Sequence, residues 1–149
     1  MKRFISVILV FILIVSCSIA VSAEQIAAEP KTEIEYFEDG SYTVTVLEES
    51  NSLARAGKSG KKTKTYYTAS NEPVFSVTVT GTFSYTSGVS AEATGSSVVV
   101  SLYKDAANFV SKSATYRNAT AYGSGTVSYL GFTRAMSTNI TCDIYGNLS

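Results

Sequence analysis

The chain has 149 residues, which corresponds to at most one ordinary domain. It contains no His and no Trp, so the Ser-His-Asp and Cys-His catalytic units and the common His-containing zinc sites are excluded. The formal net charge is zero, which excludes the overall basicity that is typical of nucleic-acid-binding proteins.

The first 23 residues have the pattern of a secretory signal peptide. A basic start, Lys2-Arg3, precedes an apolar run from Phe4 to Ala23 that ends in small residues suited to cleavage. A membrane anchor is an alternative, because roughly 20 apolar residues span a bilayer. A second alternative is a lipid on Cys17, because "IVSC" resembles a bacterial lipobox. We therefore expect a secreted, extracellular protein, or else one that is lipid-anchored on the outer face of the cytoplasmic membrane.

Residues 24–56 begin with an acidic lead-in and continue as a short β-hairpin. Asp39-Gly40 favours a tight turn, because glycine accepts a positive φ. After this turn, Tyr42, Val44 and Val46 alternate with threonines, which indicates a half-buried strand. An isolated hairpin is only marginally stable in water, so we expect it to pack on the main domain or to extend the edge of its sheet.

The next segment, Ser50 to Lys64, has the composition of a linker. Its residues are small, polar and cationic, which is typical of a solvated loop. Proteolytic processing near Arg55 is the alternative, and it would make residues 24–56 a pro-segment. The cationic residues could also hold the protein near anionic envelope polymers. We therefore expect three parts: a signal peptide (1–23), a lead-in with hairpin and linker (24–56), and the main domain (57–149).

Residues 73–88 contain the clearest strand of the sequence. Apolar and hydroxyl side chains alternate over most of its length, as they do in a strand with one buried and one solvated face. The apolar face comprises Phe75, Val77, Val79, Gly81, Phe83 and Tyr85. Gly81 interrupts this face and predicts a bulge or a sharp bend, as where a strand passes from one sheet to another.

Shorter alternating segments follow, separated by polar turns. They predict strands at residues 97–103, 108–115, 119–131 and 139–145, with a turn at Arg117-Asn118. In the last of these strands, one face is formed by Ile140, Cys142 and Ile144. No amphipathic helix is expected after the signal peptide. Together with the hairpin, about eight strands favour an all-β fold, an antiparallel immunoglobulin-like β-sandwich, over a barrel.

The main domain offers few groups for chemistry. It has four scattered carboxylates, which solvated turns explain better than a catalytic pair does: Glu72, Glu92, Asp105 and Asp143. Cys142 loses its only potential partner when Cys17 is removed or acylated. As a free cysteine on an apolar face, it is expected to be a buried and unreactive core residue. We therefore predict no catalytic, cofactor-binding or metal-binding residue and no enzyme activity.

Tyrosines remain as candidates for recognition. Exposed tyrosines beside Ser and Thr are common in binding surfaces, and the alternative is cross-strand pairing that steadies a sheet. Those expected to face outward are Tyr66, Tyr67, Tyr103, Tyr116, Tyr122 and Tyr145. We predict an exported, non-catalytic protein that binds an unknown extracellular or envelope partner. No nucleic acid is expected as a partner, and the membrane is contacted only through the signal segment or a lipid on Cys17. The alternative is a secreted bacteriocin-like antagonist that is activated by cleavage near Arg55.

Several motifs together resemble a family of small secreted β-rich proteins of Gram-positive gut bacteria, a domain of unknown function. The motifs are "DGSYTVTVLEE", "ARAGKSGKKTKTYY", "FSVTVTGTFSY" and "TCDIYGNLS". The resemblance implies export and a β-rich domain. It also implies an aromatic residue, often Trp, at the position of Phe75, and a cysteine near Ala93 that would bridge to Cys142; neither Trp nor that cysteine is present here. A looser likeness, to the lactococcin 972-type bacteriocins, covers only export and an all-β body.

Overall fold

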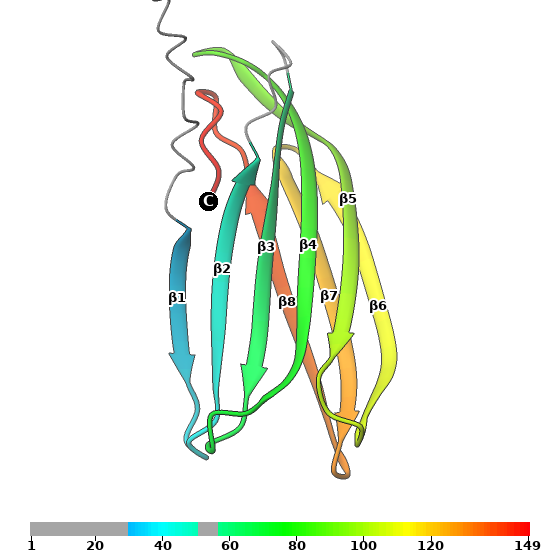
Figure 1. The fold of residues 1–149 in the computed structure, drawn as a ribbon. Coiled ribbons are helices and arrows are strands. Elements are labelled where there is room, and N and C mark those ends of the chain that lie inside the picture. Colours follow the sequence, from blue (N-terminus) through cyan, green and yellow to red (C-terminus); the bar gives the residue numbers. More distant parts are fainter. Residues whose placement is uncertain (1–29, 51–56) are drawn as a thin grey trace, which may run out of the picture.

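A computed structural model describes residues 30–50 and 57–149 as two layers of β-strands (Figure 1). The expectations for the signal peptide, for acylation of Cys17 and for cleavage near Arg55 concern residues outside these ranges. The described residues form eight strands, and none of them belongs to a helix that could cross a membrane. All strand pairs are antiparallel, so the expected all-β sandwich of about eight strands is confirmed.

The strands form a five-stranded and a three-stranded sheet. The five-stranded sheet contains, in order, β1 (Lys31–Tyr36), β2 (Tyr42–Ser50), β3 (Gly57–Tyr67), β4 (Pro73–Thr86) and β5 (Ser90–Leu102). The three-stranded sheet contains β6 (Ala107–Arg117), β7 (Thr120–Tyr129) and β8 (Phe132–Thr141). Within each sheet, the paired strands are therefore consecutive in sequence, whereas immunoglobulin domains use Greek-key connections.

The β1–β2 hairpin extends one edge of the five-stranded sheet, which is one of the two arrangements expected for it. Gly40 adopts a φ of +78° in the turn, and β1 is paired with β2 along its whole length. β2 is in turn paired with β3, from Tyr42 opposite Tyr67 to Ser50 opposite Ser59. The hairpin is thus continuous with the sheet that contains the long strand β4.

The expected linker is wrong for residues 57–64, which form the first part of β3. Two of the four lysines of this strand form ion pairs with acids of the hairpin. Lys58 Nζ lies 2.9 Å from Glu49 Oε2, and Lys64 Nζ lies 2.9 Å from Glu35 Oε2. The hydrogen bond from Lys64 also lowers the pKa of Glu35. The composition indicated a loop because it does not reveal these partners, which lie on other strands.

The core lies where the three-stranded sheet covers β3, β4 and β5. β4 buries the apolar face that its alternation predicts, with exposures of at most 2 % for Phe75, Val77, Val79 and Phe83. Opposite them, β7 contributes a row of mostly small residues: Ala121, Gly123, Gly125 and Val127. A Cβ atom on Gly123 would lie under 3.0 Å from methyl groups of Val79 and Val98. The missing side chain therefore lets the two sheets approach closely.

The expectation that Gly81 marks a passage between sheets is wrong, because β4 stays in the five-stranded sheet from end to end. The expected bulge does occur next to it, between Thr82 and Phe83. A Cβ atom on Gly81 would lie 2.7 Å from the ring of Phe83 and 2.9 Å from the Cβ atom of Ala121. The glycine therefore makes room for an aromatic ring beneath the opposite sheet.

The strand expected at residues 139–145 ends earlier, at Thr141. The carboxylate of Asp143 accepts the backbone N–H groups of Tyr145 and Asn147, each at 2.8 Å. The side-chain amide of Asn147 donates to the same carboxylate and is the main cause of the lowered pKa of Asp143. These bonds form a turn, as expected for this carboxylate, and the turn ends the strand.

The turn decides which residues of this segment are buried. It brings Leu148 opposite Cys142, with which it forms a single β-bridge. Ile140 and Cys142 are at most 1 % exposed, as expected. Ile144 is 39 % exposed, so its expected place in the core is wrong, because it lies within the turn.

Candidate binding site

The outer face of the three-stranded sheet is polar and nearly free of charge. Alternation places there the residues of β6, β7 and β8 that do not face the core. The register aligns them in rows across the strands, such as Thr115–Tyr122–Asn139 and Ser113–Ser124–Ser137. The other outward residues are Asn108, Ser111, Arg117, Thr120, Thr126, Ser128, Thr133, Ala135 and Thr141. Among all outward residues of these three strands, Arg117 alone is charged.

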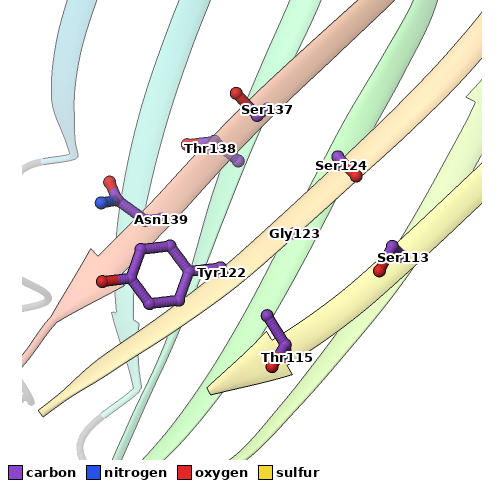
Figure 2. Close-up of a pocket in the computed structure, with 8 residues that line it drawn as sticks. All are labelled: Ser113, Thr115, Tyr122, Gly123, Ser124, Ser137, Thr138 and Asn139. Atoms are coloured by element: carbon purple, nitrogen blue, oxygen red, sulfur yellow. The ribbon is translucent and has the colours of Figure 1, made fainter. Parts of the chain in front are cut away.

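A shallow hollow of about 290 Å³ crosses this face (Figure 2). Eight residues from all three strands line it: Ser113, Thr115, Tyr122, Gly123, Ser124, Ser137, Thr138 and Asn139. None of them carries a charge. Tyr122 is the only aromatic residue in the lining, and it is 41 % exposed. The hollow therefore combines one accessible aromatic ring with hydroxyl and amide groups.

The strand beneath the hollow is held from behind. The Oγ hydroxyl of Ser96 on β5 donates a hydrogen bond of 2.9 Å to the backbone carbonyl of Tyr122. The next residue, Gly123, rests against Val79 and Val98 of the opposite sheet. Since the interior is close-packed, β7 cannot sink inward at this point. The hollow is therefore preformed.

Four of the six tyrosines expected to face outward are exposed: Tyr103, Tyr116, Tyr122 and Tyr145. Only Tyr122 lines the hollow. Tyr116 neighbours it in space but points to the other face of the sheet, because Tyr116 is paired with the core residue Ala121. Tyr103 is engaged through its hydroxyl, which lies 3.0 Å from Ser76 Oγ.

The other two tyrosines, Tyr66 and Tyr67, have structural roles. Tyr66 faces inward, so its expected outward position is wrong; its ring lies 4.3 Å from the guanidinium carbon of Arg134 and packs at 5.9 Å against Phe75. Tyr67 stacks on Tyr42 of the neighbouring strand, with ring centroids 4.9 Å apart. This stacking is the cross-strand pairing considered as the alternative for these side chains.

A second cavity, of about 400 Å³, lies between the sheets near the β1–β2 turn and is more apolar. Its cationic group, Arg134 of β8, already has partners. The guanidinium carbon lies 4.7 Å from the ring of Phe37 and 4.3 Å from that of Tyr66, and one nitrogen is 3.9 Å from Asp39. These contacts attach the hairpin turn to β8, so we assign Arg134 a structural role.

The ionisable groups of the main domain are dispersed. Glu72 pairs with Lys104 at 3.1 Å, and Asp143 holds the turn that follows β8. Within residues 30–50 and 57–149, no three His, Cys, Asp or Glu side chains come together as metal ligands would. Cys142 is free and buried, and this burial, followed by the charge of Asp143, raises the pKa of its thiol.

Ala93 and Cys142 are attached to the same turn between β6 and β7. The backbone N–H of Ala93 donates to the carbonyl of Asn118 at 2.7 Å, and that of Cys142 donates to the carbonyl of Ala119 at 2.9 Å. Ala93 is 2 % exposed and belongs to the core. Because position 93 is alanine, this chain cannot form the bridge that the family resemblance implies.

Sequence reasoning named Tyr122 but missed the residues around it. Ser113 and Ser124 belong to segments with weak alternation, and Ser137 lies outside the predicted strands. Asn139 begins a predicted strand, but the prediction there concerned the apolar face on the opposite side. Their shared feature, outward hydroxyl or amide groups at alternate positions of three successive strands, is visible in the sequence once the strands are known.

The fold and the hollow together define a class: an all-β sandwich with an open, uncharged, hydroxyl-lined surface. No family model, curated protein or solved structure matches the chain.

Proposed function

We propose that the protein is an exported, non-catalytic binding module whose partner is an extracellular or cell-envelope component. The observation that carries this proposal is the hollow on β6, β7 and β8, which places an exposed tyrosine among hydroxyl and amide groups. Binding sites of this kind use an aromatic body for contact area and polar groups for orientation. The signal-peptide pattern of residues 1–23 supports export.

The chemistry of the hollow supports binding rather than turnover. Serine and threonine hydroxyls are weak nucleophiles unless a general base lies beside them. The chain has no histidine, and the lining of the hollow contains no carboxylate and no lysine. The groups in the hollow can thus donate and accept hydrogen bonds but have no partner that would activate them.

Sedimentation with insoluble envelope material tests this proposal. The secreted protein is mixed with purified bacterial cell walls, and the bound fraction is measured together with the release of soluble wall fragments. We expect binding without release. Release of fragments in proportion to protein concentration and time would overturn the non-catalytic assignment, and a failure to sediment with any wall preparation would overturn the envelope partner.

A further inference from the structure

We infer that the ligand of the outer face of β6, β7 and β8 is a neutral saccharide that stacks on Tyr122. This inference rests on the binding function proposed above and names the class of ligand. Three properties of the hollow lead to it: its charge, its hydrogen-bonding groups and its aromatic ring.

The charge of the surface argues for an uncharged ligand. A polyanion such as a nucleic acid or an acidic polymer is bound by several cationic groups, which form charge-assisted hydrogen bonds to it. The outward residues of β6, β7 and β8 include a single cation, Arg117, at the end of a strand and outside the lining of the hollow. They include no carboxylate, so a cationic ligand finds no counter-charge either.

The polar groups of the hollow argue for a ligand rich in hydroxyls. Serine, threonine and tyrosine hydroxyls each donate and accept hydrogen bonds, and the amide of Asn139 does both as well. An apolar ligand would strip water from these groups without replacing its hydrogen bonds, which costs free energy for each unsatisfied group. Saccharide hydroxyls also donate and accept, so they can replace that water group by group.

Tyr122 supplies the apolar contact. A sugar ring has an apolar C–H face and a rim of hydroxyls, and an aromatic ring flanked by polar groups complements both. Thr115 and Asn139 lie on either side of Tyr122 in the same row, one strand away in each direction. The two neighbouring strands therefore place them about 10 Å apart. Figure 2 shows Tyr122 between these two residues.

The architecture favours a polymer over a single sugar. The hollow is open and shallow, so one ring buries little surface and binds weakly. Hydroxyl-bearing residues continue along β7 beyond the hollow, at Thr126 and Ser128. Successive sugar units of one polysaccharide can contact this row of hydroxyl-bearing residues. Because the sugar units are covalently linked, their contacts together raise the overall affinity. Because the hollow is preformed, little conformational entropy is lost on binding.

Affinity electrophoresis tests the inference. The secreted protein migrates through native gels that contain a neutral polysaccharide (mixed-linkage β-glucan, glucomannan, galactomannan or dextran) or an anionic one (alginate or polygalacturonate). We expect at least one neutral polymer to retard the protein more than the anionic ones do, with little effect of salt. We expect Tyr122→Ala to weaken binding about tenfold, because stacking is lost, and Tyr122→Phe to weaken it by no more than about threefold.

Tyr116→Ala is the matched control, because Tyr116 is also exposed and nearby but lies on the other face of the sheet. It should bind as the unaltered protein does. Unfolding curves for all variants separate loss of a contact from loss of the fold.

The possible failures are distinguishable. Retardation by anionic polymers alone, abolished by salt, would overturn the ligand class while leaving a binding function. Cell-wall binding without retardation by any neutral polymer would also overturn the neutral saccharide as the ligand and leave a binding function. Saccharide binding that survives Tyr122→Ala, or is lost equally in Tyr116→Ala, would overturn the site. The absence of binding to cell walls and to every polymer would overturn the proposed binding function itself.

Discussion

Replacing Gly123 with alanine tests how closely the two sheets approach. The new Cβ atom would lie under 3.0 Å from methyl groups of both Val79 and Val98, whereas carbon atoms in contact are about 3.5–4.0 Å apart. Neither valine can yield easily, because Val79 is fully buried and Val98 is 7 % exposed. Overpacking of this kind typically costs about 1–3 kcal/mol.

The substitution also has a stabilising effect, which offsets part of the cost of overpacking. Alanine restricts the unfolded chain more than glycine does, which stabilises a protein by about 0.4–1 kcal/mol where the backbone permits. The backbone permits it here, because Gly123 does not have a positive φ. Two close methyl groups place the overpacking near the upper end of its range, so we expect Gly123→Ala to lower the free energy of unfolding by about 2 kcal/mol.

Urea unfolding, followed by tyrosine fluorescence or circular dichroism, measures this difference. Ser124→Ala is the matched control, because Ser124 is the next residue of β7 and points away from the core; it should change stability by less than about 0.5 kcal/mol. Val98→Ala removes one of the opposing methyl groups, so the double variant should be more stable than additivity predicts, by about 1 kcal/mol. A Gly123→Ala variant as stable as the unaltered protein would refute the close approach of the sheets.

Four further outcomes are expected. Cys142 should resist a bulky thiol reagent in the native protein and react only on unfolding; rapid native labelling would place it at the surface. Cleavage at Arg55 should leave two fragments that co-elute in gel filtration, because β2 and β3 stay hydrogen-bonded; spontaneous dissociation would favour a removable pro-segment. Arg134→Ala should cost about 1 kcal/mol in urea unfolding through its lost ring contacts, and no loss would contradict the structural role. Stability should fall in acid, because the folded-state pKa of Asp143 is lowered: its contribution is present above the unfolded pKa of about 4 and is lost as pH falls through the folded value. Asp143→Asn should flatten the dependence of stability on pH in this range, and an unchanged dependence would contradict the role of Asp143.

The all-β class could be predicted from the sequence because strand alternation and turn chemistry are local signals. The period-two pattern from Phe75 to Phe83 identified both the longest strand and its buried face. Gly40 likewise marked a turn that requires a positive φ. Each signal depends only on neighbouring residues, so no knowledge of the fold was needed to interpret it.

Other features depend on partners that are distant in sequence. Lys64 resembled a loop residue because its partner Glu35 lies 29 positions away, on the far side of a hairpin. Gly81 has room only for a hydrogen because Ala121 and the ring of Phe83 pack against it, and only the stacking of the sheets reveals this contact.

The candidate site also depends on residues that are distant in sequence. Tyr122 could be named from composition, but its position between Thr115 and Asn139 follows from the registers of two strand pairs. No local pattern specifies those registers, because most of the outward side chains are small and polar. The sequence could therefore predict Tyr122 as a recognition residue, but it could not predict the uncharged hollow around it.

The consecutive order of the strands has a consequence for how the chain folds. Each ladder joins two strands that follow one another along the chain, so it can close from its own turn, and hairpins form in about 1–10 μs. A Greek-key sandwich must instead bring distant strands together before their contacts stabilise it, and such topologies fold in milliseconds to seconds. In this protein, the long-range step is the docking of one finished meander on the other. The residues that allow that docking, Gly123 and Gly125, should therefore influence the folding rate more than any turn does.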